Sequence, residues 1–156
     1  MLTVAPKHWY SWEFTLAAGD RVVADIDISS WRERGRLQVN GRAYRVYRDG
    51  MMGPFILDAD GVEVARAAKP SAFHRAFVLR HEGRELELRA ANALRRQFLL
   101  LDGGTEVGVI DPQSVWTRSA DVEFRIPLPE AVQAFIVWLT LLLWKRESDG
   151  GAAASG

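Results

Sequence analysis

The sequence contains no cysteine, few lysines and no net charge, and each of these absences excludes a class of protein or site. Without cysteine there is no disulfide, no thiolate metal site and no palmitoylation site. The 20 basic and 20 acidic residues balance, so bulk electrostatics does not direct the chain toward nucleic acid. The opening stretch, MLTVAPKHWYSWEF, holds no apolar run of the kind a secretory signal needs. Arginine far outnumbers lysine and alanine is abundant, which we interpret as the mark of a GC-rich bacterial genome.

Patterns that would support catalysis or metal binding are also missing. His8, His74 and His81 are scattered, without an acidic neighbour at the spacing of a metal site or a catalytic triad. Asp58 and Asp60 stand as at the start of a calcium loop, but a strand-like run follows where such a loop needs further ligands. The glycines form neither a phosphate loop nor a dinucleotide fingerprint. We therefore expect no catalytic residues, no metal and no cofactor.

What is present, between residues 10 and 126, is a long series of short runs in which apolar and polar residues alternate. Such alternation is the pattern of half-buried β-strands. The runs are separated by two-residue turn signals, Asn40-Gly41, Asp60-Gly61, Glu82-Gly83 and Gly103-Gly104. No helical pattern of ten residues intervenes, which argues against βαβ units. The sequence predicts an antiparallel barrel or sandwich of about ten to twelve strands.

The most apolar segment, AFIVWLTLLLW, lies close to the end of the chain. Pro129 and Glu130 suit the first turn of a helix, and residues 131–144 carry no charge. As a helix this run spans about 21 Å, against about 30 Å for the hydrocarbon core of a bilayer. A helix that is apolar on all sides must be enclosed, and a barrel of about a dozen strands is wide enough to enclose it. We therefore predict a helix over about 129–146 at the centre of a barrel.

These patterns predict three parts: an N-terminal arm over 1–9, a single barrel domain over 10–146 and a disordered tail over 147–156. The tail, ESDGGAAASG, is rich in glycine and small residues. The alternative for the apolar segment is a C-terminal anchor, with residues 128–144 inserted in a bilayer.

The segment ADVEFRIPLPEAVQAFIVWLTLLLW, from Ala120 to Trp144, resembles the tubby C-terminal-like superfamily. This superfamily includes tubby proteins, phospholipid scramblases and LURP-one-related proteins. In scramblases an acidic, aromatic strand and a proline-leucine step likewise lead into an apolar helix. The runs FILDADGVEVARA and RRQFLLLDGGTEVGVI are similar to a hairpin and a later strand of scramblase and LURP-one-related chains. The resemblance covers about residues 10–146 and implies a closed antiparallel barrel of about twelve strands, with the apolar helix threading its centre.

The resemblance also implies a link to phospholipids at the level of the family. The chain departs from scramblases where they carry a calcium-associated acidic loop, because only Asp121 and Glu123 stand near that position. The basic pocket through which tubby proteins bind phosphoinositides has no residue-by-residue counterpart here. The lipid link therefore needs support from the charges of this chain.

The cations are concentrated in two stretches of the sequence. Residues 66–96 hold eight cations against three glutamates, and residues 32–48 hold six arginines against one glutamate. On one barrel face these side chains would form an anion-binding patch, because guanidinium groups bind phosphate bidentately. The alternative is that the arginines point outward and pair with acidic residues of neighbouring strands. The candidate residues for binding anionic lipid are Arg66, Lys69, Arg75, Arg95 and Arg96.

The function we expect is that of a non-enzymatic, tubby-like and scramblase-like barrel that binds phospholipid head groups or a protein partner through an arginine-rich face. We expect it in the cytoplasm, peripheral to the membrane, and without a nucleic-acid partner, because no RNA-binding motif accompanies the arginines. The alternatives are the tail-anchored membrane protein, and a small-molecule-binding barrel or enzyme with its site at the barrel mouth.

Overall fold

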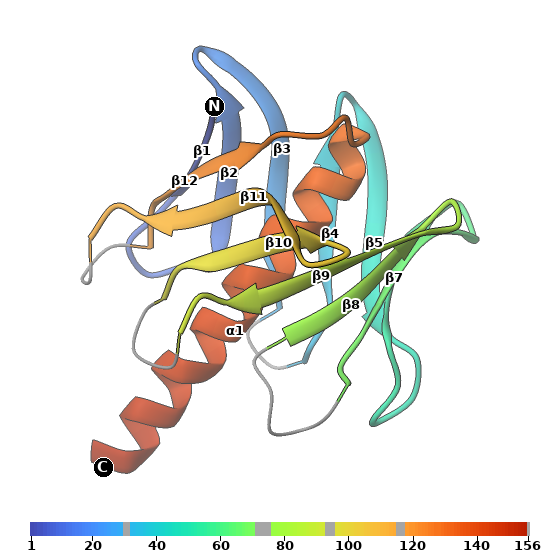
Figure 1. Cartoon of the computed structure of the whole chain (residues 1–156). Helices are drawn as coiled ribbons and strands as arrows, with labels where there is room; N and C mark the ends of the chain where they lie inside the picture. Colours follow the sequence, from blue (N-terminus) through green and yellow to red (C-terminus); the bar gives the residue numbers. More distant parts are fainter. Residues whose placement is uncertain (30–31, 71–75, 93–95, 115–117, 156) are drawn as a thin grey trace.

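The computed structural model of the chain is a closed antiparallel barrel of twelve strands followed by one C-terminal helix (Figure 1). It describes residues 1–29, 32–70, 76–92, 96–114 and 118–155, with backbone only at 151–155. The predicted fold class is confirmed.

The elements and their bounds are β1 Leu2–Pro6, β2 Glu13–Ala18, β3 Arg21–Ile28, β4 Gly35–Val39, β5 Arg42–Arg48, β6 Phe55–Ala59, β7 Val62–Ala68, β8 Ala76–His81, β9 Arg84–Ala90, β10 Phe98–Asp102, β11 Thr105–Pro112, β12 Ala120–Phe124 and α1 Glu130–Ser155. Each strand pairs with its neighbours in sequence, and β1 pairs with β12 to close the ring, with Leu2 opposite Val122. The topology is therefore an up-and-down barrel without a free strand edge.

The apolar and polar residues that alternate in the sequence correspond to side chains that point alternately into the barrel and out to solvent. On β3, Ala24, Ile26 and Ile28 are buried, while Asp25 and Asp27 between them point to the solvent side. The period of two along a strand places every second side chain inside. The same pattern recurs on other strands, including β4 and β9, whereas all five residues of β6 are buried. The interior is lined by apolar side chains.

The two-residue turns are formed by residues with positive φ, as a tight hairpin requires. Asn40 and Gly41 have φ of 50° and 79°, and Asp60 and Gly61 have φ of 52° and 83°. The turns at Glu82-Gly83 and Gly103-Gly104 are built in the same way. All four predicted hairpins are thus found.

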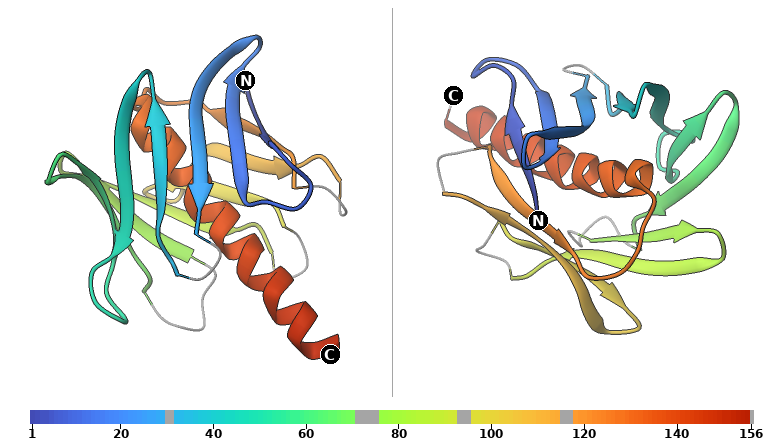
Figure 2. Two further views of the ribbon diagram at one scale, coloured as in Figure 1. Left: turned by 180° about the vertical axis from the view of Figure 1, so that it is seen from behind. Right: turned by 90° about the horizontal axis from the view of Figure 1, so that it is seen from above.

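Helix α1 fills the interior of the barrel, as the views from behind and from above both show (Figure 2). From Ala131 to Lys145 every residue except Gln133 is buried. The polar side chains of Gln133 and Thr140 form hydrogen bonds with nearby backbone carbonyls. The Gln133 amide donates to the Leu128 carbonyl at 2.9 Å, and the Thr140 hydroxyl donates to the Ile136 carbonyl at 3.1 Å. The strands therefore supply the enclosure that such an apolar helix needs.

Two tryptophans attach the helix to the barrel wall. The Trp138 indole donates to the Asp27 carbonyl at 3.2 Å, and the Trp144 indole donates to the Arg96 carbonyl at 2.9 Å. Gly35 makes room for the first of these contacts, because a Cβ there would lie 2.3 Å from the Trp138 nitrogen. Buried indoles usually find such a partner, and here the partners fix the depth of the helix.

The structure differs from the expected domain bounds at both ends of the chain. The first residues form β1, not an arm, because the edges of β2 and β12 each need a partner to close the ring. The helix continues to Ser155 in place of a disordered tail. Once a helix is nucleated, each further turn costs little, and an ion pair of 2.7 Å between Lys145 and Asp149 supports the extension.

Candidate functional site

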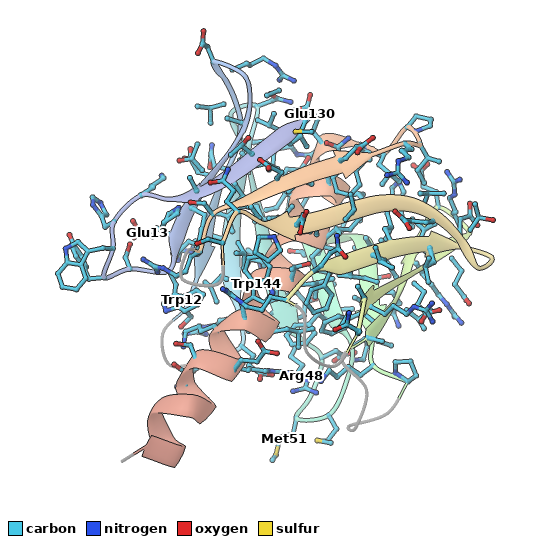
Figure 3. The ribbon with its side chains drawn as sticks, turned by 60° about the vertical axis from the view of Figure 1, so that its left-hand side comes forward. Trp12, Glu13, Arg48, Met51, Glu130 and Trp144 are labelled. Carbon is cyan, nitrogen blue, oxygen red and sulfur yellow. The ribbon has the colours of Figure 1, made fainter. Side chains whose placement is uncertain are left out.

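The two ends of the barrel are built differently. At the hairpin end, five two-residue turns join β2 to β3, β4 to β5, β6 to β7, β8 to β9 and β10 to β11. At the loop end, the six connections from each odd-numbered strand to the next even-numbered one have six or seven residues. Helix α1 begins at the hairpin end near Glu130 and leaves the barrel at the loop end near Trp144 (Figure 3). Functional residues usually lie on longer loops held by a rigid scaffold.

The connections at the two ends of the barrel differ in charge. The five hairpin turns hold three acidic residues, Asp20, Asp60 and Glu82, and no cation. The described residues of the loop-end connections include two acidic residues, Glu33 and Asp49. Against these the same connections carry the cations Lys7, Arg32, Arg34, Lys69, Arg96 and Arg118. The loop end is therefore the cationic end of a chain without net charge.

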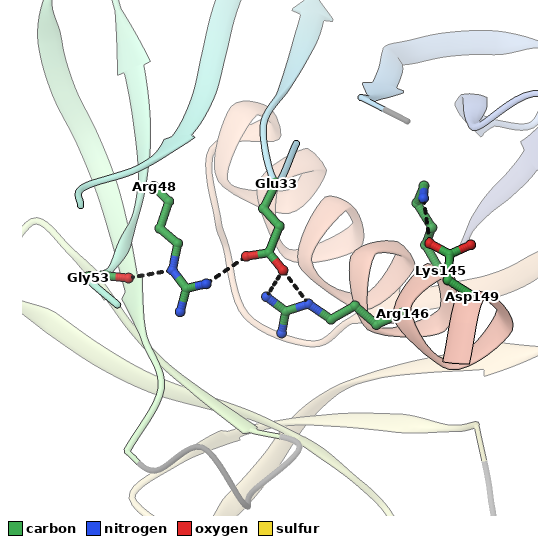
Figure 4. Close-up of polar contacts among 6 residues, drawn as sticks. All are labelled: Glu33, Arg48, Gly53, Lys145, Arg146 and Asp149. Carbon is green, nitrogen blue, oxygen red and sulfur yellow. Dashed lines mark hydrogen bonds and ion pairs between the residues drawn. The ribbon is translucent and has the colours of Figure 1, made fainter. Parts of the chain in front are cut away.

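Glu33 is the centre of a cation cluster where α1 leaves the barrel (Figure 4). One carboxylate oxygen accepts from the Arg48 guanidinium at 2.7 Å, and the other accepts from the Arg146 Nε at 2.7 Å. Arg146 also contacts Glu33 through a second guanidinium nitrogen. These three residues come from the β3–β4 connection, the end of β5 and α1. One carboxylate thus bridges two arginines.

Lys69 completes this group, which we call the Glu33 cluster: Glu33, Arg48, Lys69 and Arg146. Burial lowers the pKa of the Lys69 ammonium, the charges of Arg146 and Arg48 lower it further, and Glu33 partly offsets them. Its ammonium also lies 5.9 Å from the centre of the Phe77 ring. The cluster therefore combines three cations with one anion in a partly buried place.

Contacts other than Glu33 hold Arg48 in position. Its Nε donates to the Gly53 carbonyl at 3.1 Å, and its guanidinium lies over the Phe55 ring at 5.2 Å. Ring stacking and a fixed carbonyl restrict the orientation of an arginine fork. The side chain is consequently arranged before any ligand arrives.

Of the predicted lipid-binding residues, Arg66 and Lys69 line one hollow of about 350 Å³ between β7 and β8. Lys69 and Arg96 lie at the loop end, and the Arg96 guanidinium lies over the Trp144 ring at 4.6 Å. Arg66 lies on the outer wall of β7 and is paired with Glu63 at 2.6 Å. Arg75 and Arg95, like His74, lie outside the described residues.

Several arginines on the barrel wall pair with acidic residues, which is the alternative that the sequence left open. Arg45 contacts Asp58 at 2.8 Å, and Arg80 contacts Glu85 at 3.2 Å. The exposed Arg80–Glu85 pair contributes little stability, whereas the Asp58 carboxylate is buried and needs Arg45 as its partner. These two arginines of the wall are therefore neutralised by neighbouring carboxylates.

Protruding apolar side chains accompany these cations. Trp9 is 87% exposed and Tyr10 67% exposed in the β1–β2 connection, and Met51 and Met52 are 90% and 80% exposed in the β5–β6 connection. Met51 points away from the barrel in Figure 3. The Arg118 guanidinium donates to the carbonyls of His8, Trp9 and Ser11, so the first of these loops is tied down. Exposed aromatic and methionine side chains often mark interaction surfaces.

The chain was compared with protein families, with curated proteins and with solved structures. No family model, no curated protein and no solved structure matches it.

The histidines that the structure describes are engaged in local contacts. The His8 ring stacks on Tyr10 at 5.2 Å, and the His81 Nδ1 lies 3.1 Å from the Val64 carbonyl. Among the described residues, no group of three or more histidine, aspartate or glutamate side chains is arranged to hold a metal ion. No helix that these residues form has both the length and the apolar content needed to cross a bilayer.

Sequence reasoning did not find Glu33, Arg48 and Arg146 as one site. They are far apart along the chain, and no local motif joins them. The order of the connections in the sequence could have shown which of them lie together, because alternate connections of an up-and-down barrel lie at the same end. Summing the charges of alternate connections would have separated a cationic end from an acidic one.

Proposed function

We propose that this protein is a non-enzymatic, tubby-like and scramblase-like barrel that binds anionic phospholipid head groups at its loop end. The observation that carries the proposal is the coincidence of two features on that end: an excess of cations in the connections, and the exposed side chains of Trp9, Tyr10, Met51 and Met52. Cations near an anionic membrane contribute about 1 kcal/mol each. Tryptophan and tyrosine suit the head-group region because one part of the ring is apolar and the other polar.

The interior arrangement supports a peripheral contact over insertion of α1. Residues from Ala131 to Lys145, with the exception of Gln133, are covered by the barrel wall, and both buried indoles donate hydrogen bonds to that wall. A tail anchor would require this segment to leave the barrel and expose the apolar lining of the strands. The helix also fills the space that a ligand inside the barrel would need.

Vesicle co-sedimentation tests the proposal. Vesicles of phosphatidylcholine with a quarter phosphatidylserine should bind the protein, pure phosphatidylcholine should not, and binding should fall as sodium chloride rises. The variant R32Q/R34Q removes two exposed cations of the loop end. We expect it to bind about tenfold more weakly, from about 1 kcal/mol per cation with partial compensation.

The matched control is R42Q/R84Q, which removes two cations near the hairpin end that pair with Asp60 and Asp102. It should bind as the parent does. Equal loss in both variants would show attraction by overall charge without a defined face. Binding that does not respond to salt, or no binding at all, would overturn the lipid proposal and leave a protein partner for the loop end.

A further inference from the structure

The Glu33 cluster is a place where positive charge exceeds negative charge in partly buried surroundings. Glu33 contacts both Arg48 and Arg146. A single carboxylate carries one negative charge against the two guanidinium groups that it contacts. Unbalanced charge is costlier here than in open solvent, because fewer water molecules screen it.

An acidic side chain of α1 beside this place is already engaged. Asp149 is paired with Lys145 at 2.7 Å, one turn further along the helix, as Figure 4 shows. A shallow hollow of about 130 Å³ lies between α1 and the β3–β4 connection, and its lining includes Glu33, Arg146, Arg32, Lys145 and Asp149. Glu33 and Arg146 are therefore open to solvent on this side, whereas Arg48 lies outside the lining of the hollow.

We infer that Arg48 and Arg146 form a binding site for a phosphate group, and that Glu33 occupies this site when no phosphate is bound. A phosphate monoester carries about −1.5 to −2 charges and three strong acceptor oxygens. It matches the excess charge better than a carboxylate does. The two arginine forks, which now meet one carboxylate from two sides, are the groups that bind phosphate oxygens in pairs.

The exchange leaves Arg48 in place, because Phe55 and the Gly53 carbonyl hold it independently of Glu33. The backbone of Arg146 follows the buried part of α1, and its guanidinium, which now contacts Glu33, can contact a phosphate in the same place. The Glu33 side chain is 35% exposed, so it can rotate into water and be rehydrated when phosphate replaces it. Glu33 then acts as an internal competitor that sets a threshold for binding.

The inference rests on the proposed function only for the source of the phosphate, which is either a lipid head group or a free phosphate ion. Isothermal titration with inorganic phosphate at fixed ionic strength tests the site itself. The variant E33Q removes the competitor's charge, and we expect it to bind phosphate about tenfold more tightly than the parent. Adding R48Q to E33Q should remove that gain.

The matched control is E63Q, which removes the same charge from a paired glutamate on the barrel wall. It should bind phosphate as the parent does. An equal affinity for phosphate in E33Q and E63Q would overturn the inference. If E33Q does not fold, E33D shortens the carboxylate so that it reaches only one arginine, and a gain over the parent is again required.

Vesicles distinguish the two sources. Phosphatidic acid exposes a phosphate monoester, whereas phosphatidylserine exposes a diester, and both are used at equal surface charge. A gain of E33Q on phosphatidic acid alone identifies the head group, and a gain only with inorganic phosphate identifies the free ion. Phosphate binding without any vesicle binding would retain this site and reject the proposed function; vesicle binding without a phosphate gain would do the reverse.

Discussion

The hairpin end and the loop end are built by the same twelve strands, yet they differ in length, charge and chemistry. Two-residue turns with positive φ close one end, where Arg21, Arg42 and Arg84 are each paired with an acidic residue. Connections of six or seven residues form the other end, with surplus cations and exposed Trp9 and Met51. The hairpin end is thus specified by backbone geometry, and the loop end is free to carry binding residues.

The largest expected effect comes from the helix that both ends share. Leu139 is fully buried in α1, and L139R would place an unpaired cation in the apolar interior. The cost is several kcal/mol, comparable to the whole stability of an ordinary domain. We expect insoluble or molten protein with no cooperative thermal transition. V62R, at an exposed position of β7, should melt like the parent. A soluble L139R protein with the parental melting temperature would contradict the enclosed helix.

An intermediate effect is expected at the hairpin end. Gly41 has a φ of 79°, which a residue with a Cβ adopts only with strain. G41A should therefore destabilise the fold by about 1 kcal/mol in urea denaturation, and it should leave vesicle binding unchanged.

The matched substitution for G41A is G150A in α1, where a Cβ has open space around it. Alanine favours a helix over glycine, so this change should have the opposite sign or none. Loss of vesicle binding in G41A without unfolding would remove the distinction between the two ends.

The smallest effect concerns the loop end and depends on pH. Burial and the neighbouring Arg146 and Arg48 lower the pKa of Lys69 below its ordinary value of 10.5. The Lys69 ammonium therefore holds its proton more tightly in the unfolded chain than in the folded chain. Below the pKa of Lys69 in the folded chain, where this ammonium is charged, the folded state is destabilised. K69M should be more stable than the parent at neutral pH, and the difference should shrink as the pH rises toward 10.5.

Urea denaturation of both proteins at several pH values measures that difference. K7M removes a lysine that is ion-paired with Asp25 at 2.8 Å and serves as the control, because no gain at neutral pH is expected there. A difference between K69M and the parent that grows toward high pH would show that Lys69 is stabilised, not strained, in its cluster.

Much of the architecture was readable from the sequence because it follows from local rules. The alternation in VVADIDIS assigned Ile26 inward and Asp27 outward without any knowledge of partners. Turn pairs such as Asn40-Gly41 predicted hairpins because their backbone tolerates positive φ. The uninterrupted apolar surface of α1 required an enclosure, whatever its shape.

Other features depend on residues that meet only after folding. Closure of the ring pairs Leu2 with Val122, and nothing in the run LTVAP announces that partner. The Glu33 cluster joins a loop, a strand end and the last buried turn of a helix.

Periodicity and turn signals act over a few residues, so they determined the strands, the hairpins and the buried helix. Which charges face one another across the barrel mouth was decided by the tertiary structure alone, because electrostatic contacts depend on distance in space and not on separation along the chain.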